Sequence, residues 1–194
     1  HDALPISALM ILISIPLMYE MPSILAFWLK TVPPNTEVFC RALMIAFICD
    51  QTTLGLHAAN QAMGKIKIYT LATTLPKIML IPIMWFALKL GGSVDVAMAC
   101  YIAIELLVAI FRLPYMHYST KLNVGNYISK VIMPLIPLCI IECIVCHFMT
   151  SILQCPFRFL ITGIVSLMAS CIAIWFFTFT KSERNYFVKL IKRK

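Results

Sequence analysis

The stretch VDVAMACYIAIELLVAIFRLPYMHY (residues 94–118) decides the fold. It is a nearly unbroken apolar run, and a membrane-spanning helix needs about 20 mainly apolar residues. Similar runs recur along the chain and are separated by short polar or proline- and glycine-containing breaks. The sequence therefore predicts an all-α, polytopic transmembrane helix bundle of about six helices. The six predicted helices cover residues 7–29, 37–63, 68–90, 94–118, 128–150 and 157–180.

Composition supports a membrane protein rather than a soluble one. Hydrophobic residues make up 61% of the 194 residues and charged residues 12%, whereas soluble domains carry roughly 25% charged residues. A core of this size cannot hide so much apolar surface from water, so lipid is the natural solvent. Most of the eight cysteines lie in apolar runs, where cysteine behaves as a small hydrophobe. We expect free thiols, no metal and no cofactor.

The net charge of +8 is distributed in a way that predicts topology. Six of the sixteen basic residues lie in the tail 181–194, and most others flank apolar runs, which argues against a nucleic-acid partner. Loops of one set carry Lys65, Lys67, Lys121 and Lys130 besides the tail, while the other set carries Lys30, Arg41, Lys89 and Arg158. Basic residues favour the cytoplasmic side. The tail and the start of the first helix are therefore predicted to be cytoplasmic.

The first residues differ in character from the rest of the chain. The chain starts without methionine, and residues 1–6 (HDALPI) resemble the translated end of a DNA-sequencing adapter. We exclude this segment from the fold prediction as an artefact. The expectation that follows is a natural sequence truncated at its N-terminus.

Four ionisable residues lie near the middle of predicted spans: Asp50, Lys77, Glu105 and Glu142. Charges at this depth are costly and normally face a bundle interior or a wet cavity. Asp50 and Lys77 reach similar depth on consecutive helices and are predicted to pair, either as a neutralised structural pair or as a site that alternates between pairing and binding substrate or a proton. Glu105 and Arg112 are two helical turns apart and share a face.

The helix 37–63 is the most polar of the six. Asp50, Thr53, His57 and Asn60 follow helical three-to-four spacing and form one stripe, which we expect to face a cavity; burial by neighbouring helices is the alternative. Two other predicted helices contain paired prolines, at which we expect kinks. These prolines are Pro76, Pro82, Pro134 and Pro137.

Several short segments resemble a known family. They are Ile15-Pro16-Leu17, the run ILAFWL (24–29), Val32-Pro33-Pro34, the turn QAMGKIKIY (61–69), and Ser182-Glu183-Arg184 before the basic tail. Taken together, residues 8–194 resemble the bacterial Wzx-type O-antigen and capsule polysaccharide flippases of the MOP (MATE-like) superfamily. Members have two pseudo-symmetric lobes, so six helices ending in a cytoplasmic tail resemble the C-terminal lobe, with the N-terminal lobe missing from this chain.

The resemblance implies a function in the bacterial inner membrane. It implies the flipping of undecaprenyl-diphosphate-linked oligosaccharide from the inner to the outer leaflet, through a wet and partly cationic cavity, driven by a gradient of H⁺ or Na⁺. Membrane lipids and the missing N-terminal lobe are the other implied partners. Independently of the family, depth in the membrane selects the candidate residues. Cavity or substrate-binding candidates are Arg41, Asp50, His57, Lys77 and Arg112, and ion-coupling candidates are Asp50, Glu105 and Glu142.

Other functions remain open at this point. A MATE-type drug or metabolite exporter would share the fold. A polysaccharide polymerase or membrane acyltransferase is less favoured, because the outer loops are short and His57 and His147 fall at opposite membrane faces. No catalytic residue is therefore predicted. Cys143-Ile-Val-Cys146-His147 matches a haem c attachment pattern, but it lies within an apolar helix, which disfavours haem. A structural subunit without transport activity is the last alternative.

Overall fold

The computed structural model describes residues 3–64, 66–153, 155 and 157–174, and within these residues it is helical and contains no strand. This confirms the all-α bundle. The first half of the chain forms α1 (Ala3–Tyr19), α2 (Met21–Trp28), α3 (Thr36–Gln51), α4 (Leu54–Ala62) and α5 (Ile66–Lys89). The second half forms α6 (Val94–Thr120), α7 (Val124–Tyr127), the π-helix η1 (Ile128–Ile132), α8 (Met133–Ile152) and α9 (Arg158–Ala173).

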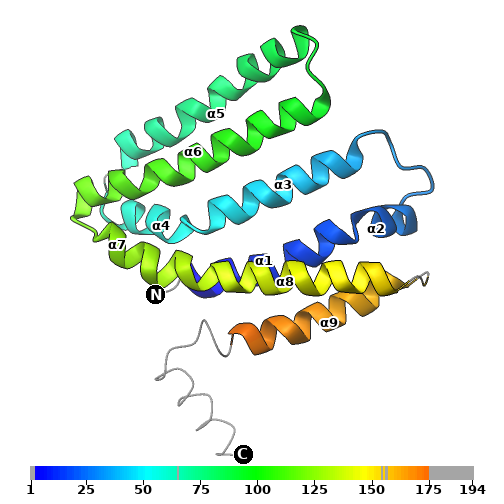
Figure 1. Ribbon diagram of the computed structural model, residues 1–194. Coiled ribbons are helices and arrows are strands. Elements are labelled where there is room, and N and C mark those ends of the chain that lie inside the picture. Colours follow the sequence, from blue (N-terminus) through cyan, green and yellow to red (C-terminus); the bar gives the residue numbers. More distant parts are fainter. Residues whose placement is uncertain (1–2, 65, 154, 156, 175–194) are drawn as a thin grey trace, which may run out of the picture.

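The long helices form a row in which neighbours pack side by side (Figure 1). α5 packs on α6, α6 on α3, α3 on α1, and α1 on both α8 and α9. The connections between the long helices alternate between the two ends of the helices, so α5 runs antiparallel to α6 and α8 antiparallel to α9. Gly64 and Gly91 adopt φ values of 71° and 84° at two of these turns. Glycine has no Cβ and tolerates this left-handed conformation, which explains why the chain turns there.

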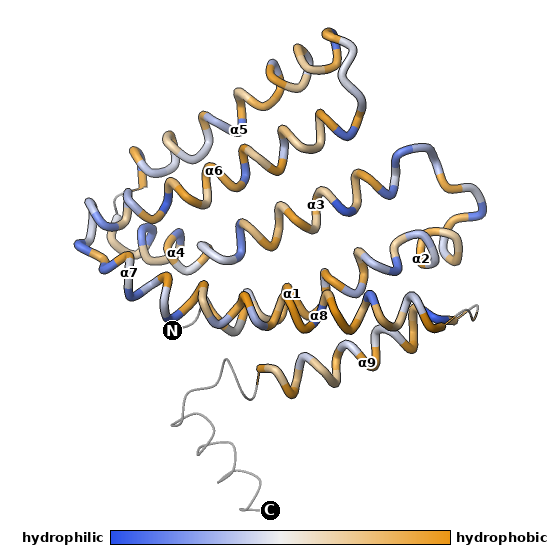
Figure 2. Tube along the Cα trace, in the orientation of Figure 1, coloured by the Kyte–Doolittle hydropathy of each residue, from blue (hydrophilic) through white to orange (hydrophobic). Residues whose placement is uncertain are grey.

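Several of the described helices have the length and apolar composition of membrane spans. Three of them, over 66–89, 94–120 and 124–152, are long and apolar enough to cross a bilayer, and counting each of two bent helix pairs as one span gives up to five. Apolar residues dominate along the helices and polar ones gather at the turns (Figure 2). The predicted helix 157–180 is described only to residue 174, where α9 contributes a shorter apolar helix. The tail 181–194 lies outside the described residues.

The predicted helix 7–29 is wrong in one respect, because it is two helices. α1 begins at Ala3, within the segment assigned to the adapter, and α1 and α2 meet at 75° around Glu20. Pro22 lacks an N–H group and cannot donate to the carbonyl of Met18 four residues earlier. Arg41 Nε of α3 donates to that Met18 oxygen instead, at 3.0 Å. The break thus follows from proline chemistry and is satisfied by a neighbouring helix.

The predicted helix 37–63 is also two helices, α3 and α4, bent by 48° at Thr52 and Thr53. The Thr52 hydroxyl donates to the carbonyl of Cys49 at 2.7 Å, and the Thr53 hydroxyl donates to that of Asp50 at 3.2 Å. Threonine hydroxyls that bond to nearby carbonyls compete with helical hydrogen bonds. Two such residues in succession account for the interruption.

The internal prolines have different effects. α5 continues as one helix through Pro76 and Pro82. By contrast, η1 occupies the residues just before Pro134. The ring of Pro134 would clash with the carbonyl of Lys130 in a regular α-helix, and a wider π turn relieves that clash. The predicted distortion of the helix 128–150 therefore occurs at its beginning.

Two small hydrophobic cores hold the row together. One joins α1, α8 and α9 around Ile11, Leu138 and Ala173. The other joins α3 and α6 through Ala42, Ala97 and Met98. Small residues allow close approach of helix backbones in membranes, so α3 and α6 are held near enough for their polar side chains to meet.

Candidate functional site

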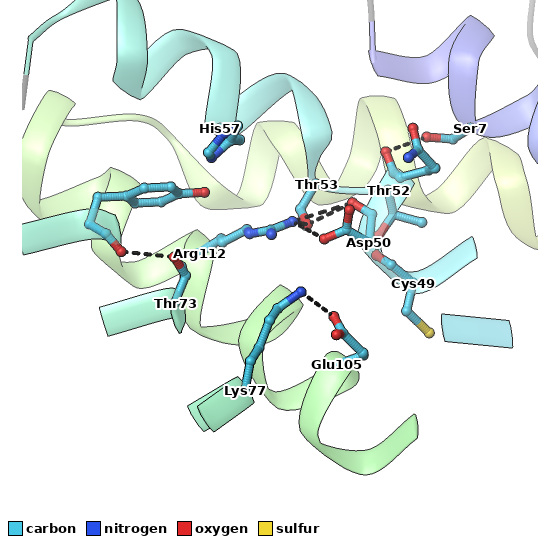
Figure 3. A network of polar contacts seen from close by, with 12 residues as sticks. Ser7, Cys49, Asp50, Thr52, Thr53, His57, Thr73, Lys77, Glu105 and Arg112 are labelled. Atoms are coloured by element: carbon cyan, nitrogen blue, oxygen red, sulfur yellow. Dashed lines mark hydrogen bonds and ion pairs between the residues drawn. The ribbon is translucent and has the colours of Figure 1, made fainter. Parts of the chain in front are cut away.

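The candidate site is built around α6, which lies between α3 and α5 (Figure 1). Glu105 and Arg112 project from the same face of α6, two turns apart, and both are buried. Each meets a charge from a different neighbouring helix (Figure 3). We call Asp50, Lys77, Glu105 and Arg112, with the neighbouring Tyr69, the charge cluster.

The first ion pair joins α5 to α6. Lys77 Nζ lies 2.8 Å from Glu105 Oε2. The Lys77 side chain is 40% exposed and that of Glu105 9% exposed, so the pair reaches the surface through the lysine. Because Lys77 is near the middle of α5, this exposed cation lies at membrane depth.

The second ion pair joins α3 to α6. Arg112 Nη1 lies 2.7 Å from Asp50 Oδ1, and the same nitrogen donates to the Thr53 hydroxyl at 2.9 Å. The predicted pairing of Asp50 with Lys77 is therefore wrong. Because α6 lies between α3 and α5, the charge on each outer helix pairs with a residue of α6.

The interruption between α3 and α4 adds backbone groups to this region. Ser7 Oγ of α1 donates to the Gln51 carbonyl at 3.0 Å, and Tyr127 Oη of α7 donates to the Thr52 carbonyl at 2.7 Å. Arg112 Nη1 reaches the Asp50 carbonyl at 3.4 Å. Backbone groups within a bilayer must be satisfied inside the protein. Three separate elements therefore converge on one broken span, next to the charge cluster.

The predicted polar stripe divides at this break. Thr53 and Asn60 are buried against neighbouring elements, as in the alternative reading, while Asp50 and His57 are partly exposed. The His57 ring packs in a tilted orientation against Tyr69, at 5.4 Å between ring centroids, and shares a hydrogen bond of 2.9 Å with Gln61. The 48° bend prevents the four side chains from facing a single cavity.

Two buried donor groups in the charge cluster are not matched by acceptors. Tyr69 Oη and Arg112 Nε are buried, and neither has a hydrogen-bond partner among the described residues. Tyr69 lies within electrostatic reach of both Arg112 and Asp50. Buried polar groups are normally hydrogen-bonded, and exceptions call for an explanation. Both groups can donate a hydrogen bond, so an acceptor ligand would satisfy them.

Two predicted site residues lie away from the charge cluster. Arg41 bonds the Met18 carbonyl and pairs with Glu37, one turn earlier on α3, at 2.7 Å; its contacts support the bend between α1 and α2. Glu142 is fully buried on α8 and contacts Ser166 and Ser170 of α9. The structure thus brings together Asp50, Lys77, Glu105 and Arg112, with His57 joined through Tyr69, but not Arg41 or Glu142.

The sequence analysis missed a third interhelical ion pair. Arg158 Nε, at the start of α9, lies 2.9 Å and 3.1 Å from the two carboxylate oxygens of Glu20, which is 1% exposed. Thr162 Oγ1 also donates to Glu20, at 2.9 Å. An acidic residue within an apolar run, just before Met21-Pro22, was the available signal. The pair ties the bend between α1 and α2 to α9.

Neither a candidate metal site among the described residues nor a known relative was found for this chain. The described residues contain no group of three or more histidine, cysteine, aspartate or glutamate side chains that could hold a metal ion. All eight cysteines are free. Comparisons with protein-family models, with curated proteins and with solved structures found no match.

Proposed function

We propose that this chain forms part of a membrane transporter, and that the charge cluster binds the diphosphate of a lipid-linked oligosaccharide. The observation that carries the proposal is a set of hydrogen-bond donors at membrane depth. Arg112 Nε and Tyr69 Oη are buried without an acceptor among the described residues, and Lys77 is a partly exposed cation that pairs with Glu105 on the same face of α6 as Arg112. Guanidinium, ammonium and phenol groups are all suited to phosphate oxygens.

The exposure of the cluster supports an aqueous or protein-covered cavity. The side chains of Lys77 and Asp50 are 40% and 27% exposed in the described chain. A charge facing hydrocarbon near the bilayer centre costs about 2.5–3.5 kcal/mol on insertion scales. This side of α3, α5 and α6 must therefore meet water or another protein surface. A second lobe, as the family resemblance implies, would supply the opposite wall.

The carboxylates give the site a resting state. Glu105 pairs with Lys77, and Asp50 pairs with Arg112, before an anion binds. A diphosphate would displace them, because its oxygens accept charge-assisted hydrogen bonds from the same donors. The broken helix beside the cluster fits this scheme, since discontinuous helices form substrate sites in many transporters. The proposed cycle carries the lipid-linked sugar from the inner to the outer leaflet of the bacterial inner membrane.

The first experiment compares three changes introduced into the gene: Lys77→Ala, Lys77→Arg, and Lys77→Ala combined with Glu105→Ala. We expect Lys77→Ala to lower both protein level and surface polysaccharide, because it leaves Glu105 unpaired. The double variant should restore protein level but not export, since the cation is still missing. Lys77→Arg should retain most export. Polysaccharide on the cell surface and lipid-linked precursor in the membrane are the readouts, with membrane protein level as the reference.

The outcomes separate a binding role from a purely structural one. A double variant that regains both protein level and export would show that the pair serves only folding. Unchanged export and unchanged protein level in Lys77→Ala would remove Lys77 from the site altogether.

A MATE-type exporter of organic cations is the second candidate, and the carboxylates favour it. Asp50 and Glu105 would hold a cationic drug, with Tyr69 as an aromatic neighbour. Gene deletion distinguishes the two functions: loss of surface polysaccharide supports the flippase, whereas altered drug susceptibility alone supports the exporter.

A further inference from the structure

A pocket lies where the first turn of α5 meets the last two turns of α6, next to the turn at Gly64. Its volume is about 600 Å³, and ligand pockets usually have about 300–1,000 Å³. We call it the α5–α6 pocket. It shares no residue with the charge cluster, so it is a separate candidate site.

One part of the pocket wall is polar and aromatic. Lys67 contributes an exposed ammonium group, and Tyr118, which is 89% exposed, contributes a phenol group. Tyr115 lies deeper and packs against the fully buried Tyr69, at 5.3 Å between ring centroids. The pocket therefore offers a cation and a hydroxyl donor at its mouth, in front of an aromatic wall that is held in place by the core.

The other part of the wall is apolar and lies at the end of two apolar helices. Ile66 and Ile68 line the pocket and are exposed. Both α5 and α6 are long and apolar enough to cross a bilayer, so their ends belong at the level of the lipid headgroups. Tyrosine and lysine are typical of this level, where their apolar parts meet lipid and their polar ends meet water. A ligand that is anionic at one end and apolar at the other would match both parts of the wall.

The basic residues at this end of the bundle are not neutralised by acidic partners. Two further pockets at the same end are lined by Lys121 and by Lys130 (Figure 1). None of these lysines, nor Lys67, forms an ion pair with a described carboxylate, and the described lining of the three pockets includes no acidic residue. At the opposite end, by contrast, Arg41 and Arg158 each pair with a glutamate. The charge of this end therefore complements an anionic partner.

We propose that the α5–α6 pocket binds the headgroup of an anionic glycerophospholipid from the membrane leaflet at this end of the bundle. Lys67 pairs with the phosphate charge, and the Tyr118 hydroxyl donates a hydrogen bond to a phosphate oxygen. The acyl chains follow the exposed apolar face of α5 from Ile68 towards the bilayer centre. Basic pockets between membrane helices bind anionic headgroups in this way.

The test is native mass spectrometry of the full chain in detergent, titrated with dioleoylphosphatidylglycerol or with zwitterionic dioleoylphosphatidylcholine. We expect tighter binding of the anionic lipid. Lys67→Gln should lower that affinity about fivefold, the loss expected for one basic residue at an anionic membrane surface, and Lys67→Arg should retain it. The matched control is Lys30→Gln, which removes the same charge from an exposed lysine at the opposite end and should leave the affinity unchanged.

Two results would overturn the proposal directly. Equal losses in Lys67→Gln and Lys30→Gln would mean that the total charge of the chain attracts the lipid. Equal affinity for the two lipids would mean that the headgroup charge is not recognised. Tyr118→Ala tests the pocket without changing charge, in a side chain too exposed to be needed for folding. This variant should also weaken binding, and an unchanged affinity would exclude this pocket as the site.

Glycerol 3-phosphate distinguishes a lipid from a soluble phosphate. It carries the same phosphate group without acyl chains, so we expect it not to displace the anionic lipid at a similar concentration. Displacement would assign the pocket to a soluble phosphate and overturn the assignment to a lipid. None of these measurements requires a transport substrate. Failure of the Lys77 export experiment would therefore reject the proposed function without affecting the lipid site.

Discussion

Arg112 is the residue with the most concentrated set of contacts in the charge cluster. Its Nη1 atom contacts the Asp50 carboxylate, the Thr53 hydroxyl and the Asp50 carbonyl, all at the end of α3. Asp50 has fewer alternatives, because its carboxylate depends on Arg112. Loss of the arginine therefore leaves a partly buried carboxylate and an unsatisfied helix end, whereas loss of the carboxylate leaves the arginine with two oxygen partners.

This asymmetry leads to a prediction for the pair. Arg112→Met should lower the free energy of unfolding by about 3–5 kcal/mol, as expected when one partner of a buried ion pair is removed, and Asp50→Asn should lower it by less. The double variant should be more stable than the sum of the single effects predicts, with a coupling energy of about 0.5–3 kcal/mol. Denaturant unfolding of the chain in detergent micelles would measure all three. Strictly additive effects would mean that the two residues act independently.

Residue-level prediction from sequence located the charges within helices but failed for the pairing of Asp50 with Lys77. An apolar run identifies Asp50, Lys77, Glu105 and Glu142 as charges far from the ends of their predicted spans, because the distance of a residue from the end of a helix is set by helical rise. Which charges meet depends on the lateral order of helices. That order is decided by contacts such as Ala42 with Ala97 and Met98, which carry no recognisable signal in one sequence.

At the scale of elements, the break between α3 and α4 is the feature with the largest structural consequence. Its carbonyl groups accept hydrogen bonds from Ser7, Arg112 and Tyr127, so α1, α6 and α7 all depend on its geometry. In the sequence, Pro22 is a recognisable signal for the other break, between α1 and α2. Thr52-Thr53 did not, because threonine occurs in regular helices and its competing hydrogen bonds depend on rotamer.

The bond from Tyr127 provides a direct test of this element. Tyr127→Phe removes the hydroxyl that donates to the Thr52 carbonyl, and should lower the free energy of unfolding by about 1–3 kcal/mol, the cost of an unsatisfied buried acceptor. The control is Tyr118→Phe, since Tyr118 is 89% exposed and its loss of a hydroxyl should change stability little. Thermal unfolding of both variants in the same detergent would suffice. Equal stability of the two variants would show that the break does not need this bond.

For the whole molecule, the two ends of the bundle are distinct surfaces. The connections after α2, α5 and α8 lie at one end, and those after α4 and α6 at the other (Figure 1). This alternation agrees with the two sets of loops defined in the sequence. Their basic residues predict which set is cytoplasmic. The arrangement of the helices alone does not indicate which end of the bundle is cytoplasmic.

Native cysteine can establish the orientation. Cys155 is exposed in the connection between α8 and α9, and we expect a membrane-impermeant maleimide to label it from the side opposite the predicted cytoplasmic face. Labelling should disappear in Cys155→Ser. Lys121→Cys in that background, at the opposite end, should react only after the membrane is made permeable to the reagent. The reverse pattern would invert the proposed topology.

The pairing of Lys77 with Glu105 also has a consequence for how the chain enters the membrane. The two residues are 28 positions apart, on either side of the turn at Gly91. During synthesis Lys77 emerges first, when no carboxylate is yet available to neutralise it. Partitioning of α5 into lipid on its own carries the full cost of a central lysine. Insertion of α5 and α6 as a single helical hairpin avoids that cost, so biogenesis of this part of the bundle depends on α5 being retained at the translocon until its carboxylate partner arrives.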